Sequence, residues 1–171
     1  APAEYDLGYK AYMAGRYQEA VQHLTSAAAR MPGSNAVYHF LGASYVQLRQ
    51  LDNGIAALIR ANSFKEDANT YDWLGLAYRR KGDFAESARC YQKALAMAPD
   101  NPVLYYGLGV ASYWMGWIPE CLQAVEMGLQ KNASPEARQQ LFELQSWVYA
   151  SRGMYPEVYG LVGQTHQIGA E

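Results

Sequence analysis

The sequence predicts an all-α fold in which helix pairs stack into a solenoid, and three observations predict it. Glycines recur at a nearly constant interval, since the steps from Gly8 to Gly42, from Gly42 to Gly75 and from Gly75 to Gly109 are 34, 33 and 34 residues. In three of these segments a further glycine follows after seven residues: Gly15, Gly82 and Gly116. Half of the residues are hydrophobic, which is enough for a continuous core. A period of this length is typical of one helix–turn–helix unit per repeat.

The first repeat shows how each helix pair is expected to form. Apolar and small residues recur at helical spacing over residues 3–14 and 17–30, which predicts two helices with a turn at Gly15. Pro32 cannot continue the second helix, because proline has no backbone N–H and clashes with the preceding turn. It therefore begins the connection to the next repeat.

Small residues are expected where the two helices of a pair touch. Gly8 and Ala20 let the helix axes approach closely, and the larger Leu7 and Leu24 are expected to fill the space beside them. Cys121 takes the position of Ala20 in the fourth repeat, so we expect a buried thiol there.

The third repeat carries the clearest pattern. Its landmark residues are Trp73, Leu74, Gly75, Tyr78, Gly82, Phe84, Tyr91, Ala94 and Pro99. This segment resembles a tetratricopeptide repeat. The resemblance implies a right-handed superhelical solenoid of antiparallel helix pairs, in which the first helix of each pair lines the concave face. Five repeats in this register, at about 1–34, 35–67, 68–101, 102–134 and 135–171, would form a single domain over residues 1–171.

Three repeats depart from the pattern: the second, the fourth, which has Ser112 where a tyrosine is usual and Gly128 in the late alanine position, and the fifth. The second has Arg49 where the turn glycine belongs and is one residue short, so the geometry of residues 63–67 is expected to deviate. The fifth has Ser146 for the first glycine, and its last helix carries Gly160 and Gly163, each of which costs up to about 1 kcal/mol relative to alanine. Terminal repeats are usually atypical, so we expect this end to fray.

The resemblance also assigns residues to the concave face. Inward positions lie three residues before, one after, and four or five after the first glycine of each repeat, and many of them hold tyrosine or tryptophan. Such stiff amphipathic side chains suit peptide recognition, and two adjacent arginines could bind a carboxylate or backbone carbonyls. The predicted partner-binding residues are Tyr5, Tyr9, Tyr12, His39, Asp72, Arg79, Arg80, Tyr106, Tyr113, Trp114 and Trp147.

Packing between helices is the competing interpretation of these rings. A core position is favoured for Tyr12 and Tyr113 because a tyrosine stripe at helical spacing is more often core than site. Exposure in the groove is favoured for the remaining rings of the first and fourth repeats: Tyr5, Tyr9, Tyr106 and Trp114.

One subtype of the family holds the free C-terminus of heat-shock chaperones in a clamp of lysine, asparagine and arginine. The matching positions in this chain hold Tyr5, Tyr9, Phe40, Asn69 and Trp73. None of the five fits, which argues against that activity.

Other function classes lack their signals. Lys and Arg total 14 against 16 Asp and Glu, so the basic stripe that nucleic acid needs is missing. His23, His39 and His166 fall in different repeats without metal-ligand spacing, and Asp72 and Glu143 have no obvious proton-transfer partner. No catalytic residue, metal site or cofactor is predicted, and no apolar run reaches the length of a membrane span.

The sequence therefore predicts a non-enzymatic protein–protein interaction module or scaffold, whose aromatic-rich concave groove binds a peptide or helical segment of another protein. The alternative is a structural subunit of a multiprotein complex, for example in a bacterial envelope or secretion system, that acts through the solenoid ends or the convex face, including by self-association. Direct membrane insertion is not expected. The chain is expected to be soluble, in the cytoplasm or, if its first residue is a processed start, in the periplasm or exported.

Overall fold

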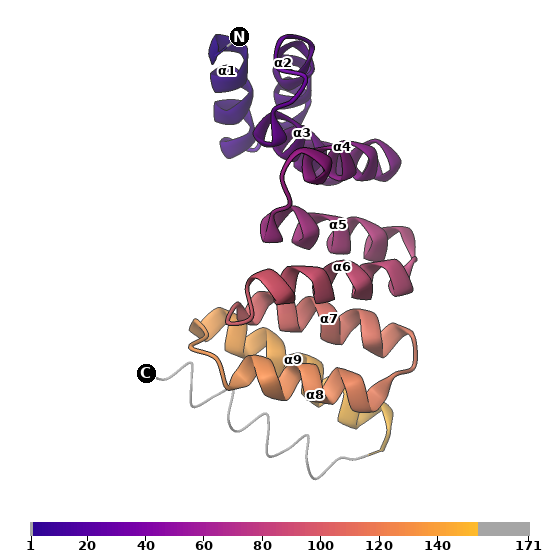
Figure 1. The fold of residues 1–171 in the computed structure, drawn as a ribbon. Helices are drawn as coiled ribbons and strands as arrows, with labels where there is room; N and C mark the ends of the chain where they lie inside the picture. Colours follow the sequence, from indigo (N-terminus) through magenta and orange to yellow (C-terminus); the bar gives the residue numbers. More distant parts are fainter. Residues whose placement is uncertain (1, 154–171) are drawn as a thin grey trace. The chain divides into compact units, whose positions relative to one another are not determined.

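The computed structural model describes residues 2–153, and these form nine α-helices and no strand (Figure 1). The helices are α1 (Pro2–Met13), α2 (Tyr17–Arg30), α3 (Asn35–Gln47), α4 (Leu51–Phe64), α5 (Ala68–Lys81), α6 (Phe84–Met97), α7 (Pro102–Trp114), α8 (Ile118–Leu129) and α9 (Pro135–Ser151). The two helices predicted for the first repeat are therefore confirmed to within one residue. The expected last helix, with Gly160 and Gly163, lies outside the described residues.

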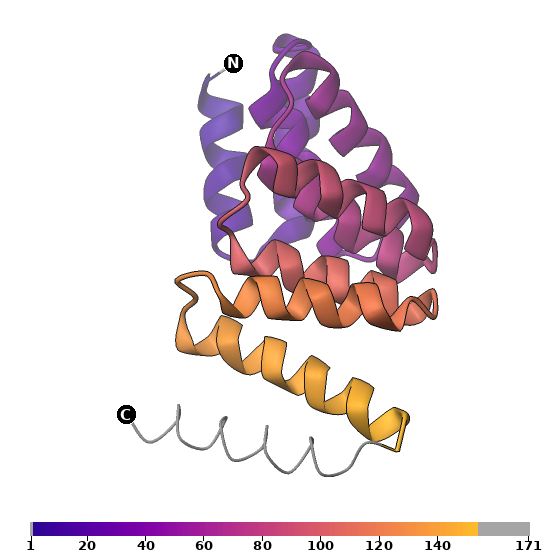
Figure 2. The same cartoon turned by 60° about the horizontal axis from the view of Figure 1, so that its bottom comes forward.

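The chain divides into two compact units, residues 1–83 with α1–α5 and residues 84–171 with α6–α9. Within each unit a helix packs on the next one in the chain. First helices of neighbouring pairs also touch, since α1 contacts α3, α3 contacts α5 and α7 contacts α9. In the second unit, Figures 1 and 2 both show α7, α8 and α9 side by side. The single domain over the whole chain stays a prediction.

The first helix of each later repeat begins at a polar capping residue. The side chains of Ser34, Asp67, Asn101 and Ser134 accept hydrogen bonds from backbone N–H groups in the first turns of α3, α5, α7 and α9. Such caps satisfy donors that the helix itself leaves unpaired. The second helices α2, α4 and α8 begin without a side-chain cap. These polar caps recur every 33 or 34 residues, so they are a second repeat signal in the sequence.

The turns inside the pairs require a left-handed backbone, as the glycine pattern predicts. Gly15, Gly82 and Gly116 have φ angles of 76°, 89° and 79°. Arg49, which replaces the glycine of the second repeat, has a φ of 63° and so takes the same conformation. The second repeat thus keeps the left-handed turn, although arginine disfavours that conformation.

The second repeat is one residue shorter because the connection after α4 is one residue shorter. Residues 65–67 join α4 to α5, whereas residues 31–34 join α2 to α3. The backbone of Lys65 is extended, and the side-chain oxygen of Asn62 accepts a hydrogen bond from the N–H of Asp67 at 3.1 Å. The expected local deviation is therefore a shortened, extended connection.

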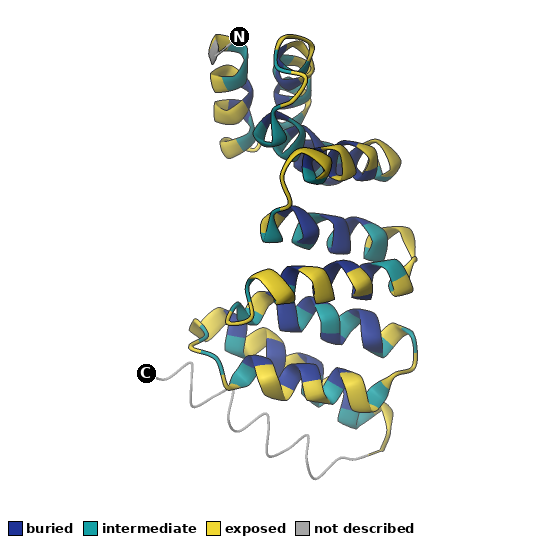
Figure 3. Ribbon diagram, in the orientation of Figure 1, coloured by how far each residue is buried: buried dark blue, intermediate teal, exposed yellow. Residues whose placement is uncertain are grey.

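Buried side chains face the neighbouring helices, while the outer faces are exposed (Figure 3). Gly8 lies against Leu24, where an added Cβ would come within 2.6 Å of the leucine Cγ. Close approach of the helices at Gly8 and Ala20 is therefore confirmed. The prediction for Leu7 is wrong, because this side chain is 47% exposed. Its counterpart Leu41 is buried by the preceding helix pair, and no described helix precedes α1.

Both cysteines are buried and neither forms a disulfide. Cys121 is fully buried, as its small-residue position predicts, and burial raises the pKa of its thiol to about 11. It packs in the core of the second unit with Val125 and Leu141.

Candidate functional site

The first unit presents an aromatic group, the N-terminal cluster, made of Tyr5, Tyr9, Tyr12 and Phe40. The three tyrosines lie three or four residues apart, so they share one face of α1. Phe40 of α3 makes an edge contact with Tyr9 at 5.0 Å between ring centroids and packs on Tyr12 at 5.2 Å. Tyr9 is 38% exposed and the other two tyrosines are half-buried.

The hydroxyls of Tyr5 and Tyr12 stay protonated at neutral pH. Burial raises the pKa of Tyr5 and of Tyr12, and neighbouring tyrosines add to the shift. Each protonated hydroxyl can donate a hydrogen bond to a partner. Phe40 completes the cluster but was not among the predicted binding residues. Its position two residues before Gly42 lies outside the inward set, so only the fold brings it to the tyrosines.

His39 links this cluster to a small polar pocket in the same unit. Its ring meets Phe40 edge-on, and its Nδ1 lies 2.8 Å from the Thr70 hydroxyl. Burial lowers the pKa of His39, and the carboxylate of Asp67 opposes that shift only in part. The imidazole is therefore neutral near pH 7. Polar residues of α3, of α5 and of the connection before α5 also line this pocket: Asn35, Lys65, Asp67 and Asn69.

The three charged residues predicted on α5 have different surroundings. Burial raises the pKa of Asp72, and the guanidinium of Arg79 opposes the shift. Arg80 is exposed, but its guanidinium donates a hydrogen bond to the Val46 carbonyl at 3.3 Å. Arg79 and Arg80 therefore do not form one paired binding site, because Arg80 already bonds the end of a helix in its own unit.

The second unit presents another aromatic group, the C-terminal cluster, made of Phe84, Tyr113, Trp114 and Trp147. Tyr113 packs on Trp147 at 4.5 Å between centroids, and the two tryptophans meet edge-on at 5.7 Å. Phe84 stacks on Trp114 at 5.9 Å. Trp114 and Trp147 are nevertheless 53% and 47% exposed. Phe84, like Phe40, was not predicted as a binding residue.

Tyr106 stands one helix turn or more from this cluster and borders a shallow pocket. Val110 of α7 and Glu143, Leu144 and Trp147 of α9 line the same pocket. Tyr106 is half-buried, as is Tyr113, whereas Trp114 is exposed.

The structure thus brings the predicted residues together in two places. Tyr5, Tyr9, Tyr12 and His39 gather in the first unit, while Tyr106, Tyr113, Trp114 and Trp147 gather in the second. A continuous groove through both units stays a prediction.

Two other kinds of site are absent from residues 2–153. No group of three or more His, Cys, Asp and Glu side chains there is arranged to hold a metal ion. Among the described helices none combines the length and the apolar character that crossing a membrane demands.

Comparisons with known proteins agree with this geometry. A family model described as "TPR repeat" matches residues 75–116. The Hsp70-Hsp90 organizing protein of Triticum aestivum is 33% identical over 105 residues, which cover 61% of this chain and 18% of that protein. The BBSome complex member BBS4 of Bos taurus is 28% identical over 61% of this chain and 20% of its own length. The chain thus spans about a fifth of these curated relatives.

Solved structures share the fold over nearly the whole chain. A crystal structure of MamA superimposes with a TM-score of 0.83 at 19% identity, covering 96% of this chain and 95% of that one. MamA from Desulfovibrio magneticus RS-1 gives a TM-score of 0.86 at 11% identity, covering 99% and 94%. At these identities the likeness shows the fold alone. The family match identifies tetratricopeptide repeat sequence over residues 75–116, and the structural likeness shows that nearly the whole chain shares this helical-repeat fold.

Proposed function

We propose that this chain binds a segment of another protein through the exposed aromatic rings of its first helices. The general role, a protein–protein interaction scaffold, follows from the repeat family. The finer proposal concerns the surface: a peptide or helical segment of the partner contacts the N-terminal cluster, the C-terminal cluster, or both. The main support for this surface is that Trp114 and Trp147 contact each other and are still about half exposed.

Exposed rings of this kind supply binding energy when a partner covers them. An aromatic side chain buries 150–250 Å² in all, and about 25 cal/mol is gained per Å² of apolar surface removed from water. Covering the exposed half of one tryptophan is therefore worth roughly 2–3 kcal/mol before the costs of association. A few such rings are enough to dominate an interface.

Polar groups beside the N-terminal cluster would fix the register of the bound segment. In the tautomer of neutral His39 whose Nδ1 accepts from the Thr70 hydroxyl, the Nε2–H is left to donate to a partner carbonyl. Asp72 and Arg79 offer an acceptor and a donor on α5, the next first helix. The rings would thus supply affinity and these groups specificity.

A catalytic role is not proposed. Tetratricopeptide repeat proteins are generally non-catalytic, although His39 lies within hydrogen-bond distance of the Thr70 hydroxyl. Thr70 is fully buried, so its hydroxyl cannot reach a substrate.

The chaperones in the name of the wheat relative are not proposed as partners of this chain. The positions that would form a chaperone clamp hold Tyr5, Tyr9, Phe40, Asn69 and Trp73. Four of these are aromatic, and the first three belong to the N-terminal cluster. The alternative of an assembly subunit acting through the solenoid ends or convex face is less well supported, because the exposed rings of the two clusters, Tyr9, Trp114 and Trp147, lie on first helices.

The test is affinity capture from the native lysate, with wild type beside the double variant Tyr9→Ala, Trp114→Ala. A matched control removes exposed apolar side chains from second helices, Ile59→Ala with Met97→Ala. Loss of a partner from the cluster variant alone, with unchanged helicity, is the expected result. Equal capture by all three proteins would contradict the proposal.

A further inference from the structure

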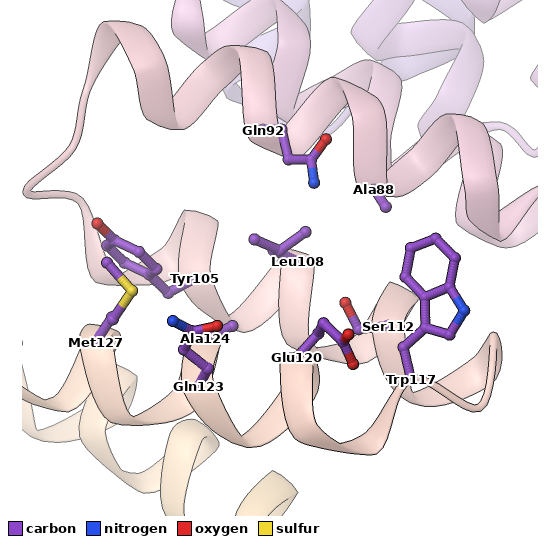
Figure 4. Close-up of a pocket in the computed structure, with 10 residues that line it drawn as sticks. All are labelled: Ala88, Gln92, Tyr105, Leu108, Ser112, Trp117, Glu120, Gln123, Ala124 and Met127. Atoms are coloured by element: carbon purple, nitrogen blue, oxygen red, sulfur yellow. The ribbon is translucent and has the colours of Figure 1, made fainter.

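A pocket of about 220 Å³ opens in the second unit on a side that uses none of the cluster residues (Figure 4). Its floor is one face of α7, and its two walls are α6 and α8. The floor residues are Tyr105, Leu108 and Ser112. The wall residues are Ala88 and Gln92 of α6 with Glu120, Gln123, Ala124 and Met127 of α8, and Trp117 closes one end.

The lining is rich in hydrogen-bond acceptors and carries negative charge. Glu120 is the charged residue among the described side chains that line the pocket, and its carboxylate accepts hydrogen bonds. Gln92 and Gln123 add an amide oxygen from each wall. No hydrogen bond or ion pair joins any of these three side chains to another described residue. Lys131 lies 5.9 Å from the Tyr105 ring and pairs with Asp100 at 3.3 Å.

An aromatic face stands beside the carboxylate. Trp117 is 50% exposed and directly precedes α8, so its indole and the Glu120 side chain border the same end of the pocket. A planar cation can stack on an indole while it donates to a carboxylate, and desolvation strengthens both contacts.

We propose that this pocket binds an arginine side chain carried by an extended segment of a partner protein. Its guanidinium stacks on Trp117 and donates to the carboxylate of Glu120. Guanidinium fits better than ammonium, because it has five N–H donors in one plane for the several acceptors present. The aliphatic stem of the arginine lies over Leu108.

The two glutamines indicate why the segment is extended. A helical segment satisfies its own backbone groups, whereas an extended one has free N–H and C=O groups along both edges. Gln92 and Gln123 stand on opposite walls, and each can donate to a carbonyl and accept from an N–H. This pocket shares no residue with the aromatic clusters, so arginine binding here does not depend on the proposed function.

The test uses three short peptides and the full chain. The probes are acetyl-Gly-Gly-Arg-Gly-Gly-amide, the same peptide with citrulline, which keeps the shape of arginine without its charge, and the same peptide with lysine. Each is titrated to about 10 mM, since contacts of millimolar affinity saturate in that range. Two-dimensional ¹H–¹⁵N NMR follows the indole of Trp117, identified with Trp117→Phe, and the side-chain amides of Gln92 and Gln123.

The arginine peptide is expected to shift these three signals and to bind about fivefold more tightly than the citrulline peptide, because the charged pair with Glu120 is lost. Glu120→Gln should weaken arginine binding by a similar factor. The matched control is Glu126→Gln, an exposed carboxylate on the same helix outside the pocket, which should leave binding unchanged. Lysine should bind more weakly than arginine.

Four results would overturn the proposal. One is an unmoved Trp117 signal at the highest peptide concentration. Another is equal affinity of the citrulline and arginine peptides. The third is an affinity in Glu120→Gln that matches that of Glu126→Gln. Shifts confined to Trp114 and Trp147 would place the arginine on the C-terminal cluster and would also overturn it.

Discussion

Gly107 of α7 lies directly against the ring of Tyr91 of α6, so closely that a methyl group on its Cα would overlap the ring. Tyr91 is buried, and its ring has no room to retreat without moving the helix. This glycine is therefore required by the contact between α6 and α7, two helices of the same unit.

Gly107→Ala is expected to destabilise the second unit despite the better helix propensity of alanine. Overpacking typically costs about 1–3 kcal/mol, against a propensity gain of up to about 1 kcal/mol. The matched control is Gly109→Ala, whose added Cβ meets only the flexible end of Leu144 at 3.0 Å. Urea unfolding should show a loss for the first variant and little change for the second. Equal stability of the two would show that the Tyr91 contact yields easily.

Arg49→Gly is expected to stabilise the first unit. Arg49 has a left-handed backbone, which costs about 1–2 kcal/mol for a residue with a side chain. Glycine avoids this cost, but it has greater conformational freedom in the unfolded chain, which offsets part of the gain in stability. A net gain of about 0.5–1 kcal/mol in the free energy of unfolding follows. The reverse change, Gly15→Ala, meets no neighbouring atom within 4 Å and should cost stability through the backbone alone. A loss of stability in Arg49→Gly would point to a contact of its side chain instead.

The helix pairs and their turns could be predicted from the sequence because they depend on residues close together in the chain. Gly15 and Gly82 mark turns by their conformational freedom alone. Leu7 was wrongly placed in the core, since its burial depends on a preceding helix pair that local spacing does not report. Phe40 and Phe84 were missed for the same reason, as each becomes part of a cluster through helices distant in sequence.

Acidification should weaken the first unit through His39. Its folded pKa is lowered by burial, while the unfolded chain titrates near 6.5. As the pH falls below about 6.5, the unfolded state takes up a proton that the folded state refuses, so the free energy of unfolding decreases until the folded pKa is passed. His39→Gln should flatten this slope, measured by urea unfolding between pH 7.5 and pH 5 in about half-unit steps. His23→Gln should keep the contribution of His39, and a slope unaffected by His39→Gln would contradict the assignment.

The thiol of Cys121 should be inert in the folded protein. Burial raises its pKa to about 11, so almost no thiolate exists at pH 8, and no surface is open to a reagent. In Cys90→Ala, which leaves Cys121 as the remaining cysteine, Ellman's reagent should react at the rate of unfolding and faster as urea is added. Stability should also fall as the pH rises above about 9, because only the unfolded chain then loses the proton. Immediate reaction without denaturant would contradict this burial.

Photo-crosslinking can test whether exposed rings on first helices recognise a partner. The photoreactive amino acid benzoylphenylalanine replaces Trp114 in one protein and Met97 in a control, since Trp114 belongs to a cluster and Met97 is an exposed residue of α6 outside it. Both proteins are irradiated with the captured partner. Crosslinks from position 114 and none from position 97 are the predicted result. Crosslinks from position 97 with none from position 114 would move the binding surface away from the clusters and contradict the account.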